Sequence, residues 1–122
     1  MKLNHLVGLF LCFLLLGLAA CEYDTIVPKE IIVPEEVSFS ADIAPIFVTV
    51  GCTGCHSGGT APDLRADKSY AALTGGGFVD TGNPEASKLV VKINAGHANS
   101  GNITATEKAM ILKWITEGAK NN

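Results

Sequence analysis

Histidine, methionine and aromatic side chains are all scarce in this chain. Its 122 residues include three histidines, two methionines and four cysteines, and aromatic residues make up 7%. Few imidazole or thioether side chains are therefore available to bind a metal, and a large aromatic core is excluded. We also find no alternation that would predict strands, no internal repeat, and no grouping of acid, base and nucleophile that would predict an enzyme.

Positive charge is also in short supply. Lys and Arg number 9 against 12 Asp and Glu, for a formal net charge of −3. A mildly acidic chain is a poor partner for nucleic acid. Because the length allows one domain at most, the sequence predicts a single small all-α domain with no nucleic-acid partner and no evident small-molecule substrate.

The first twenty residues are not expected to belong to that domain. Lys2 opens a short leader, and residues 6–18 form an apolar run of about 13 residues, which is short for a bilayer span and typical of a signal-peptide core. The run ends in Leu-Ala-Ala-Cys at Cys21, which resembles the bacterial lipobox. Residues 1–20 are therefore predicted to be a cleaved lipoprotein signal peptide, with Cys21 lipidated by acyl chains such as palmitate. The alternative is an ordinary signal in which Cys21 is incidental.

Lipidation predicts that the protein is anchored at the bacterial cell envelope, facing the periplasm or at the outer membrane, without a transmembrane helix. Residues 21–37 are rich in acidic side chains and interrupted by Pro28 and Pro34. This composition predicts a lipidated tether, followed by a domain over residues 38–122. The alternative for residues 31–33 is a short extended segment that lies on the domain.

Helical periodicity begins near Ser40, the predicted N-cap, and continues to about residue 50. Pro45 lies inside this pattern and predicts either a kink or a late start. A second short helix is predicted over residues 67–73, ended by the three glycines that follow residue 74.

Two further helices are predicted in the second half of the chain. Asn83 has the character of an N-cap and is followed by proline and an acid, which predicts a helix over residues 85–93. Thr104 and Glu107 match the capping-box pattern and precede an apolar stripe. Gly118 stands where a helix C-terminus commonly has glycine.

Cys52, Cys55 and His56 form a Cys-x-x-Cys-His motif directly after the first predicted helix. Cysteines three apart can present both sulfurs on one side of a turn, spaced for two vinyl groups of one porphyrin, and the next histidine can point at its iron. The alternatives are a Cys52–Cys55 disulfide, which has no βαβ redox setting here, and a zinc ion that includes His97. Adjacent Cys55 and His56 are poor simultaneous zinc ligands. Haem is favoured, because a covalently held apolar macrocycle would also fill a thin core.

Residues 38–122 resemble a class I c-type cytochrome domain of the kind found in small bacterial lipoproteins. The haem motif is the most diagnostic part of the resemblance. The other matching parts are the helix before it at residues 42–47, Ala-Pro-Asp-Leu at 61–64, and the terminal helix through residues 114–119.

The resemblance implies a small all-α fold of about four short helices around one covalently bound haem c. It implies thioether bonds at Cys52 and Cys55 and a proximal iron bond from His56. It also implies that the carbonyl of Pro62 accepts the Nδ1 hydrogen of that histidine, which would fix the ring.

The sixth iron ligand departs from the family pattern, in which a loop before the last helix usually supplies a methionine. Met110 instead lies inside the last predicted helix at a core-facing spacing, where packing is its expected role. His97 lies in the loop where the family places its distal ligand, and a flanking glycine permits close approach. We therefore expect His97 to be the distal ligand, with Met110 or an open site as the alternatives.

Together these expectations describe a membrane-anchored one-electron carrier of the bacterial cell envelope, which is not an enzyme. Its expected partners are redox proteins of the envelope, and its acidic surface favours a basic one. One alternative is a haem-based ligand-binding sensor or accessory subunit of a larger redox complex, and an open iron would permit weak peroxidase-like activity. The other is a structural envelope lipoprotein with a Cys52–Cys55 disulfide.

Overall fold

The computed structural model describes residues 30–122, so the predicted signal peptide, Cys21 and the first part of the tether lie outside the described residues. The described part is all-helical and has no strand, which confirms the predicted all-α class. In chain order the elements are η1 (Phe39–Ile43), α2 (Ala44–Thr49), η2 (Cys52–Gly54), α3 (Ser69–Gly75), η3 (Pro84–Ala86), α4 (Lys88–Asn94), η4 (Ser100–Asn102) and α5 (Ala105–Thr116).

The first helical segment is capped by Ser38, so the prediction of Ser40 as its N-cap was wrong. The Ser38 hydroxyl accepts a hydrogen bond from the backbone N–H of Ala41 at 3.2 Å, and the Asp42 carboxylate accepts one from the Ser38 N–H at 2.8 Å. This reciprocal pair satisfies two backbone donors at the helix start. The Ser40 hydroxyl donates instead to the carbonyl of Asn122, at 2.9 Å.

Pro45 marks the start of the α-helix proper. The preceding turn, η1, is a wider π-turn in which the N–H of Ala44 reaches the carbonyl of Phe39. α2 then begins at Ala44 with the proline in its first turn, where its missing N–H and fixed φ cost least. Of the two sequence-based alternatives, the late start is the one observed.

The middle helices differ in detail from the prediction. α3 spans Ser69–Gly75, two residues later than expected. Asn83 makes no side-chain cap, and the carboxylate of Asp80 instead accepts from the N–H groups of Gly82 and Asn83 at 2.9 and 3.1 Å. The predicted single helix over residues 85–93 is divided into η3 and α4 at Ser87, which has extended ψ of 132°. The buried Ser87 hydroxyl holds this break by bonding the backbone of Asp80.

α5 begins and ends as its sequence predicts. The Thr104 hydroxyl accepts from the N–H of Glu107 at 3.2 Å, and the Glu107 carboxylate accepts from the Thr104 N–H at 2.7 Å. Gly118 follows the helix with φ of 97°, a left-handed conformation that glycine adopts without strain.

Thr104→Ala is expected to lower the free energy of unfolding by about 1 kcal/mol, because the first turn of α5 loses its side-chain acceptor. The measurement is equilibrium denaturation of the purified chain. Thr106→Ala is the matched control, since it removes the same atoms two residues along the same helix and should change the free energy by less than about 0.5 kcal/mol. Equal losses in both variants would show that the cap contributes nothing specific.

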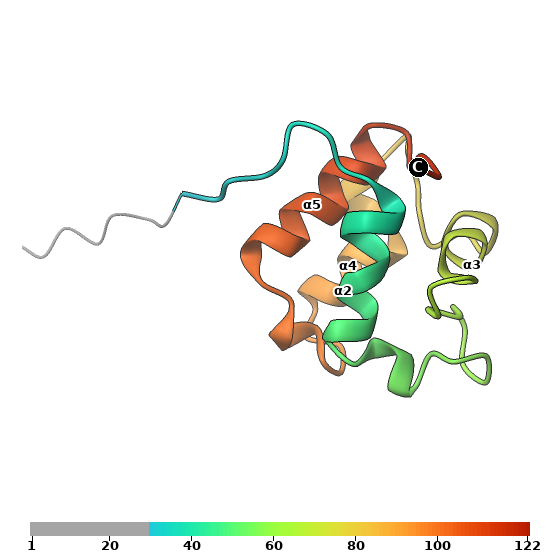
Figure 1. The fold of residues 1–122 in the computed structure, drawn as a ribbon. Coiled ribbons are helices and arrows are strands. Elements are labelled where there is room, and N and C mark those ends of the chain that lie inside the picture. The colour runs from blue at the N-terminus through green and yellow to red at the C-terminus, as the bar shows by residue number, and fades with distance from the viewer. Residues whose placement is uncertain (1–29) are drawn as a thin grey trace, which may run out of the picture.

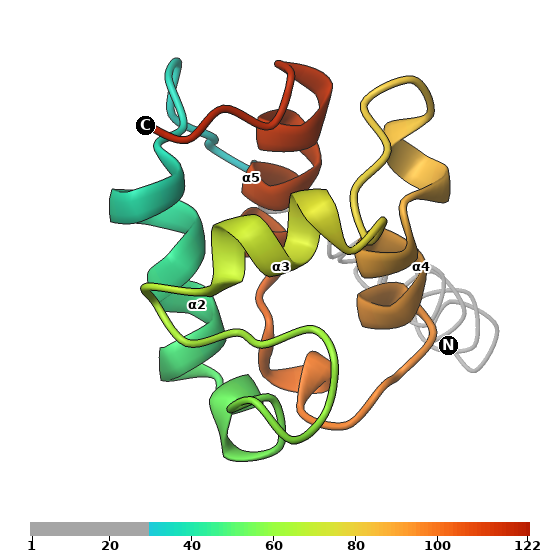
Figure 2. The same ribbon diagram turned by 90° about the vertical axis from the view of Figure 1, so that its right-hand side faces the viewer.

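The core is organised around α5. Helix α5 buries Ile111, Trp114 and Ile115 against η1 on one side and α4 on another, while α3 lies across the face turned to the viewer in Figure 2. Figure 1 shows the N-terminal segment running across the end of α5 before it enters η1. The terminal segments meet there, because the Asn122 carbonyl accepts from the N–H of Ser40 at 3.0 Å.

Three of the five aromatic residues of the domain form one cluster. The ring centroid of Phe39 lies 5.0 Å from that of Trp114 and 5.2 Å from that of Tyr70. The polar atoms of two of these rings are satisfied, because Trp114 Nε1 donates to the carbonyl of Lys120 at 2.8 Å and the Tyr70 hydroxyl donates to that of Ala119 at 3.0 Å. One edge-on contact and one tilted contact, with the polar atoms of the rings satisfied, therefore join the aromatic residues of this part of the core.

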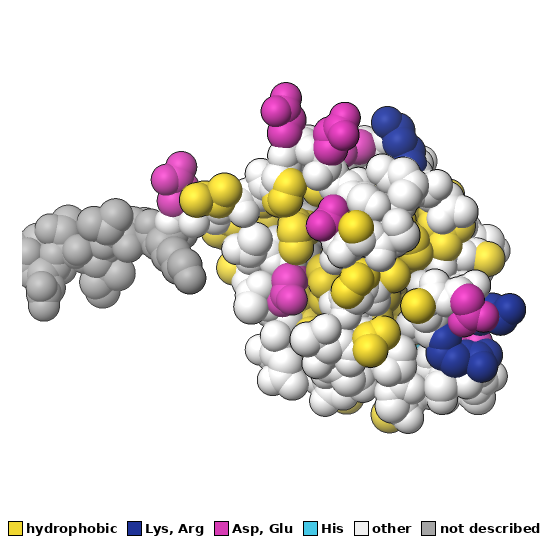
Figure 3. Space-filling model, viewed as in Figure 1, with side chains coloured by type: hydrophobic (Ala, Val, Ile, Leu, Met, Phe, Trp, Pro, Cys, Tyr) yellow, Lys and Arg dark blue, Asp and Glu magenta, His cyan; other side chains and the backbone are white. Residues whose placement is uncertain are grey.

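Part of the segment before Ser38, residues 30–37, packs on the domain. Val37 is buried in the core and Val33 packs against it, whereas Ile31 and Ile32 are exposed. Acidic side chains gather at the end of the molecule where this segment enters the fold (Figure 3). Within residues 30–122, none of the helices combines the length and apolarity needed to cross a membrane.

Candidate functional site

A largely apolar cavity of about 330 Å³ lies between the Cys-x-x-Cys-His segment and α4. Its walls include Phe47 from α2, Phe78 from the chain before η3, and Leu89 and Ile93 from α4. The two aromatic residues outside the Phe39, Tyr70 and Trp114 cluster thus line this cavity. Such a lining favours an apolar ligand.

The cysteines reach the cavity because the chain turns sharply after α2. Gly51 has φ of 83° and leads into η2, a short 3₁₀ turn that contains Cys52. The N–H of His56 donates to the carbonyl of Cys52 at 3.0 Å, which closes a helical turn over the motif. Both cysteines line the cavity as free thiols. Burial raises the pKa of the Cys52 thiol, which therefore stays protonated at neutral pH.

His56 is held with a defined tautomer. Its Nδ1 lies 3.0 Å from the carbonyl oxygen of Pro62 and 3.2 Å from that of Thr60. Because a carbonyl oxygen only accepts, Nδ1 carries the hydrogen and the lone pair of Nε2 is left free for a metal. The Leu64 N–H donates to the His56 carbonyl at 2.8 Å and closes the loop that presents these acceptors.

An ion pair stiffens the same loop. Arg65 contacts the Asp63 carboxylate at 2.6 Å through Nη2 and at 3.0 Å through Nε. The hydrogen bonds from Arg65 lower the pKa of Asp63, so the pair persists at neutral pH and is lost as the pH falls through that depressed value. The sequence analysis did not anticipate this contact.

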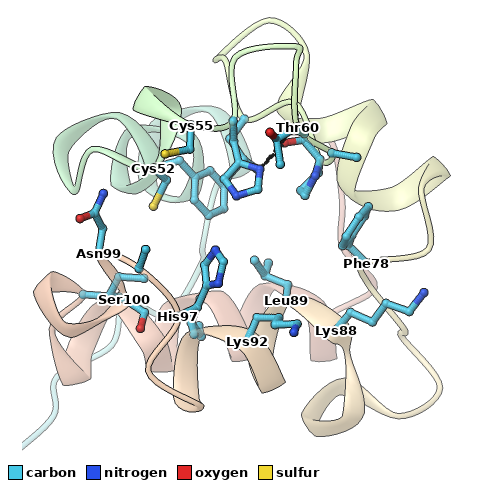
Figure 4. Close-up of a pocket in the computed structure, with 18 residues that line it drawn as sticks. Cys52, Cys55, Thr60, Phe78, Lys88, Leu89, Lys92, His97, Asn99 and Ser100 are labelled. Atoms are coloured by element: carbon cyan, nitrogen blue, oxygen red, sulfur yellow. Dashed lines mark hydrogen bonds between the residues drawn. The ribbon is translucent and has the colours of Figure 1, made fainter.

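His97 lies across the cavity from His56, and their ring centroids are 5.9 Å apart with an angle of 53° between the planes. In Figure 4 its ring rises from the wall opposite Cys52 and Cys55. An imidazole nitrogen binds a metal at about 2.0 Å, and the ring centre lies about 1.2 Å behind it, so two imidazoles on opposite sides of one metal have centres roughly 6 Å apart. The separation of the two rings therefore fits a single metal held between them.

Asn99 connects the loop of His97 to the loop of the motif. Its side-chain amide donates to the carbonyl of Gly51 at 3.2 Å, across 48 positions of sequence. Asn99 itself has φ of 64°, a left-handed conformation that asparagine tolerates better than most residues. The bond holds the two walls of the cavity together at the cysteine side. Sequence reasoning did not single out Asn99 or Thr60, because a loop amide and a backbone carbonyl carry no signal of their own.

Met110 is not brought to this site. It lies on α5, packs against the hydrophobic core while partly buried, and does not line the cavity. Among residues 30–122, no three His, Cys, Asp or Glu side chains lie close enough together to hold a metal ion by themselves. The two thiols and the two histidines line one cavity without forming such a cluster, and this arrangement could hold a macrocycle that carries its own metal.

Comparison with known proteins assigns the chain to no family. No protein-family model, curated protein or solved structure matches it.

Proposed function

We propose that the protein is a one-electron carrier that holds a single haem c covalently in the cavity, within a small class I cytochrome c-like fold. Cys52 and Cys55 would hold the macrocycle, and His56 and His97 would bind its iron. When bound, the group supplies reversible one-electron Fe(III)/Fe(II) chemistry, with one redox protein as electron donor and another as acceptor. Lipidation at Cys21 would keep the carrier at the cell envelope.

The observation that carries the proposal is the facing pair of imidazoles beside two free thiols. Their centroid separation of 5.9 Å is close to that expected when two imidazoles bind one metal. The cavity lining is largely apolar, which suits a porphyrin. A haem iron needs only two protein ligands, so a converging set of three donors is not required.

The cysteines and His56 have separate tasks in this proposal. Each thiol would add across one vinyl group: its S–H bond breaks, an S–C bond forms, and the hydrogen goes to the neighbouring vinyl carbon, so no oxidant is consumed. The hydrogen bonds of His56 to Pro62 and Thr60 would keep its Nε2 aimed at the cavity. They would also raise the basicity of the ring, which stabilises the oxidised iron.

The test is the mass and absorption spectrum of the full chain, exported in a host with cytochrome c maturation machinery. We expect a mass increase of one haem and a sharp α-band on reduction. A Cys52→Ser/Cys55→Ser double variant should lose all haem that resists extraction by acidified solvent. A colourless wild-type chain without the added mass of one haem would overturn the proposal. In that case, a mass lower by two hydrogens than that of the same chain after reduction would favour the Cys52–Cys55 disulfide of a structural lipoprotein.

A further inference from the structure

Lys88 and Lys92 are the only Lys, Arg, Asp or Glu side chains, among the described residues, that line the cavity. They lie four residues apart on α4, so both occupy the same face of the helix. The chain has a net charge of −3, yet no acidic side chain lines this cavity. The charge of the lining therefore complements an anionic ligand.

Neither lysine is engaged in an ion pair within residues 30–122. Three other cations of the domain are paired, Arg65 with Asp63, Lys68 with Asp67 and Lys113 with Glu117. Within the same residues Lys108 and Lys120 are unpaired as well, but neither lines the cavity. The ammonium of Lys88 lies 5.9 Å from the centroid of the Phe78 ring, at the edge of the cavity. Two exposed ammonium groups at the rim of an apolar cavity are thus available to a ligand.

The lysines lie away from the cysteines. Figure 4 shows Cys52 and Cys55 on one wall, while Lys88 lies beside Phe78 at the far side and Lys92 lies between Lys88 and His97. On a haem, the two vinyl groups and the two propionate groups occupy opposite sides of the ring. Thioether bonds at the cysteines would therefore direct the two carboxylates toward the side of the cavity that carries the lysines.

We propose that Lys88 and Lys92 form the carboxylate-binding end of the cavity, where their ammonium groups pair with the two propionates of the haem. This inference rests on the proposed function and adds a subsite to it. Carboxylates at the edge of an apolar cavity need such partners, because their desolvation is costly when no cation is near. The paired cations also disfavour the more positive oxidised iron, so they raise the reduction potential.

The experiment is a redox titration of the matured full chain carrying Lys88→Met, Lys92→Met or both, at low and high salt. We expect a negative shift in potential for each single variant and a larger one for the double variant. Arginine at the same positions should restore the potential, because it keeps the charge. Lys108→Met is the matched control: it removes one positive charge from α5 without touching the cavity, and should leave the potential unchanged.

Infrared difference spectra between the oxidised and reduced forms give a second readout, in which the propionate carboxylate bands should shift in the double variant. A potential and bands equal to wild type in the double variant would overturn the inference, as would an equal potential shift in Lys108→Met. If only the salt dependence of electron transfer to an acidic partner changed, the lysines would be a docking surface instead. A colourless chain would contradict the proposed function, which separates the two failures.

Discussion

Replacing His97 with alanine should turn a reduced protein that excludes carbon monoxide into one that binds it at once on mixing. The ferric spectrum should change in parallel from low spin to high spin. The reason is that His97 is the only other imidazole, among the described residues, that lines the cavity, and it faces His56. Without its imidazole, one axial position of the iron would have no protein ligand. Stopped-flow mixing with carbon monoxide and absorption spectroscopy of both oxidation states measure the effect.

Met110→Leu is the matched control for this experiment. It replaces the other ligand considered from the sequence, conserves volume, and should cost less than about 1.5 kcal/mol of stability. Its spectra and its exclusion of carbon monoxide should equal those of wild type, because Met110 packs on the core away from the cavity. Unchanged spectra in His97→Ala together with high-spin iron in Met110→Leu would reverse the ligand assignment.

The wild type itself separates electron transfer from ligand sensing. A carrier whose iron has both histidines exposes no site for a small ligand, whereas a sensor must. Rapid binding of carbon monoxide by the reduced wild type would therefore contradict the proposed bis-histidine carrier and favour the haem-based sensor. The hydrogen bond from Asn99 to Gly51 would oppose such opening, since it ties the loop of His97 to the opposite wall.

Local signals in the sequence were sufficient for α5. The Thr104 and Glu107 capping box, the apolar stripe and Gly118 all act within a few residues, and the structure has each where it was predicted. The helix predicted over residues 85–93 failed because its competing contact is not local. The buried Ser87 side chain bonds Asp80 seven residues earlier and breaks the helix there, which a propensity argument does not anticipate.

The residues of the candidate site also differ in whether local sequence or tertiary packing sets their positions. Cys52, Cys55 and His56 are adjacent in sequence, so their convergence follows from one turn. The position of His97 opposite His56 depends on how α4 and its loop pack, and was expected only from resemblance. Lys88 and Lys92 looked like any exposed lysines on a helix, because their position at the cavity rim is set by tertiary packing.

Trp114→Ala is expected to lower the free energy of unfolding by about 3–5 kcal/mol, the cost typical of a large aromatic removed from a core. The side chain is 1% exposed, and it contacts Phe39 of η1 and Tyr70 of α3. η1 leads through α2 into the Cys-x-x-Cys-His motif, and α3 follows the loop after that motif. Removing the Trp114 ring should therefore also loosen the walls of the cavity. Denaturation should be followed by far-UV circular dichroism. The chain has a single tryptophan, so the variant has no tryptophan fluorescence to follow.

Trp114→Phe separates packing from hydrogen bonding within the same position. It keeps a ring against Phe39 but leaves the carbonyl of Lys120 without its donor. The free energy of unfolding should therefore fall by less than in Trp114→Ala, with the missing hydrogen bond contributing about 1 kcal/mol. Val91→Ala, at a side chain 49% exposed on α4, should change the stability by less than about 0.5 kcal/mol. A loss below about 1 kcal/mol in Trp114→Ala would mean that the aromatic cluster is not what joins these elements. The stability of the domain would then depend more on other contacts, and the haem proposed for the cavity would contribute by covalent attachment.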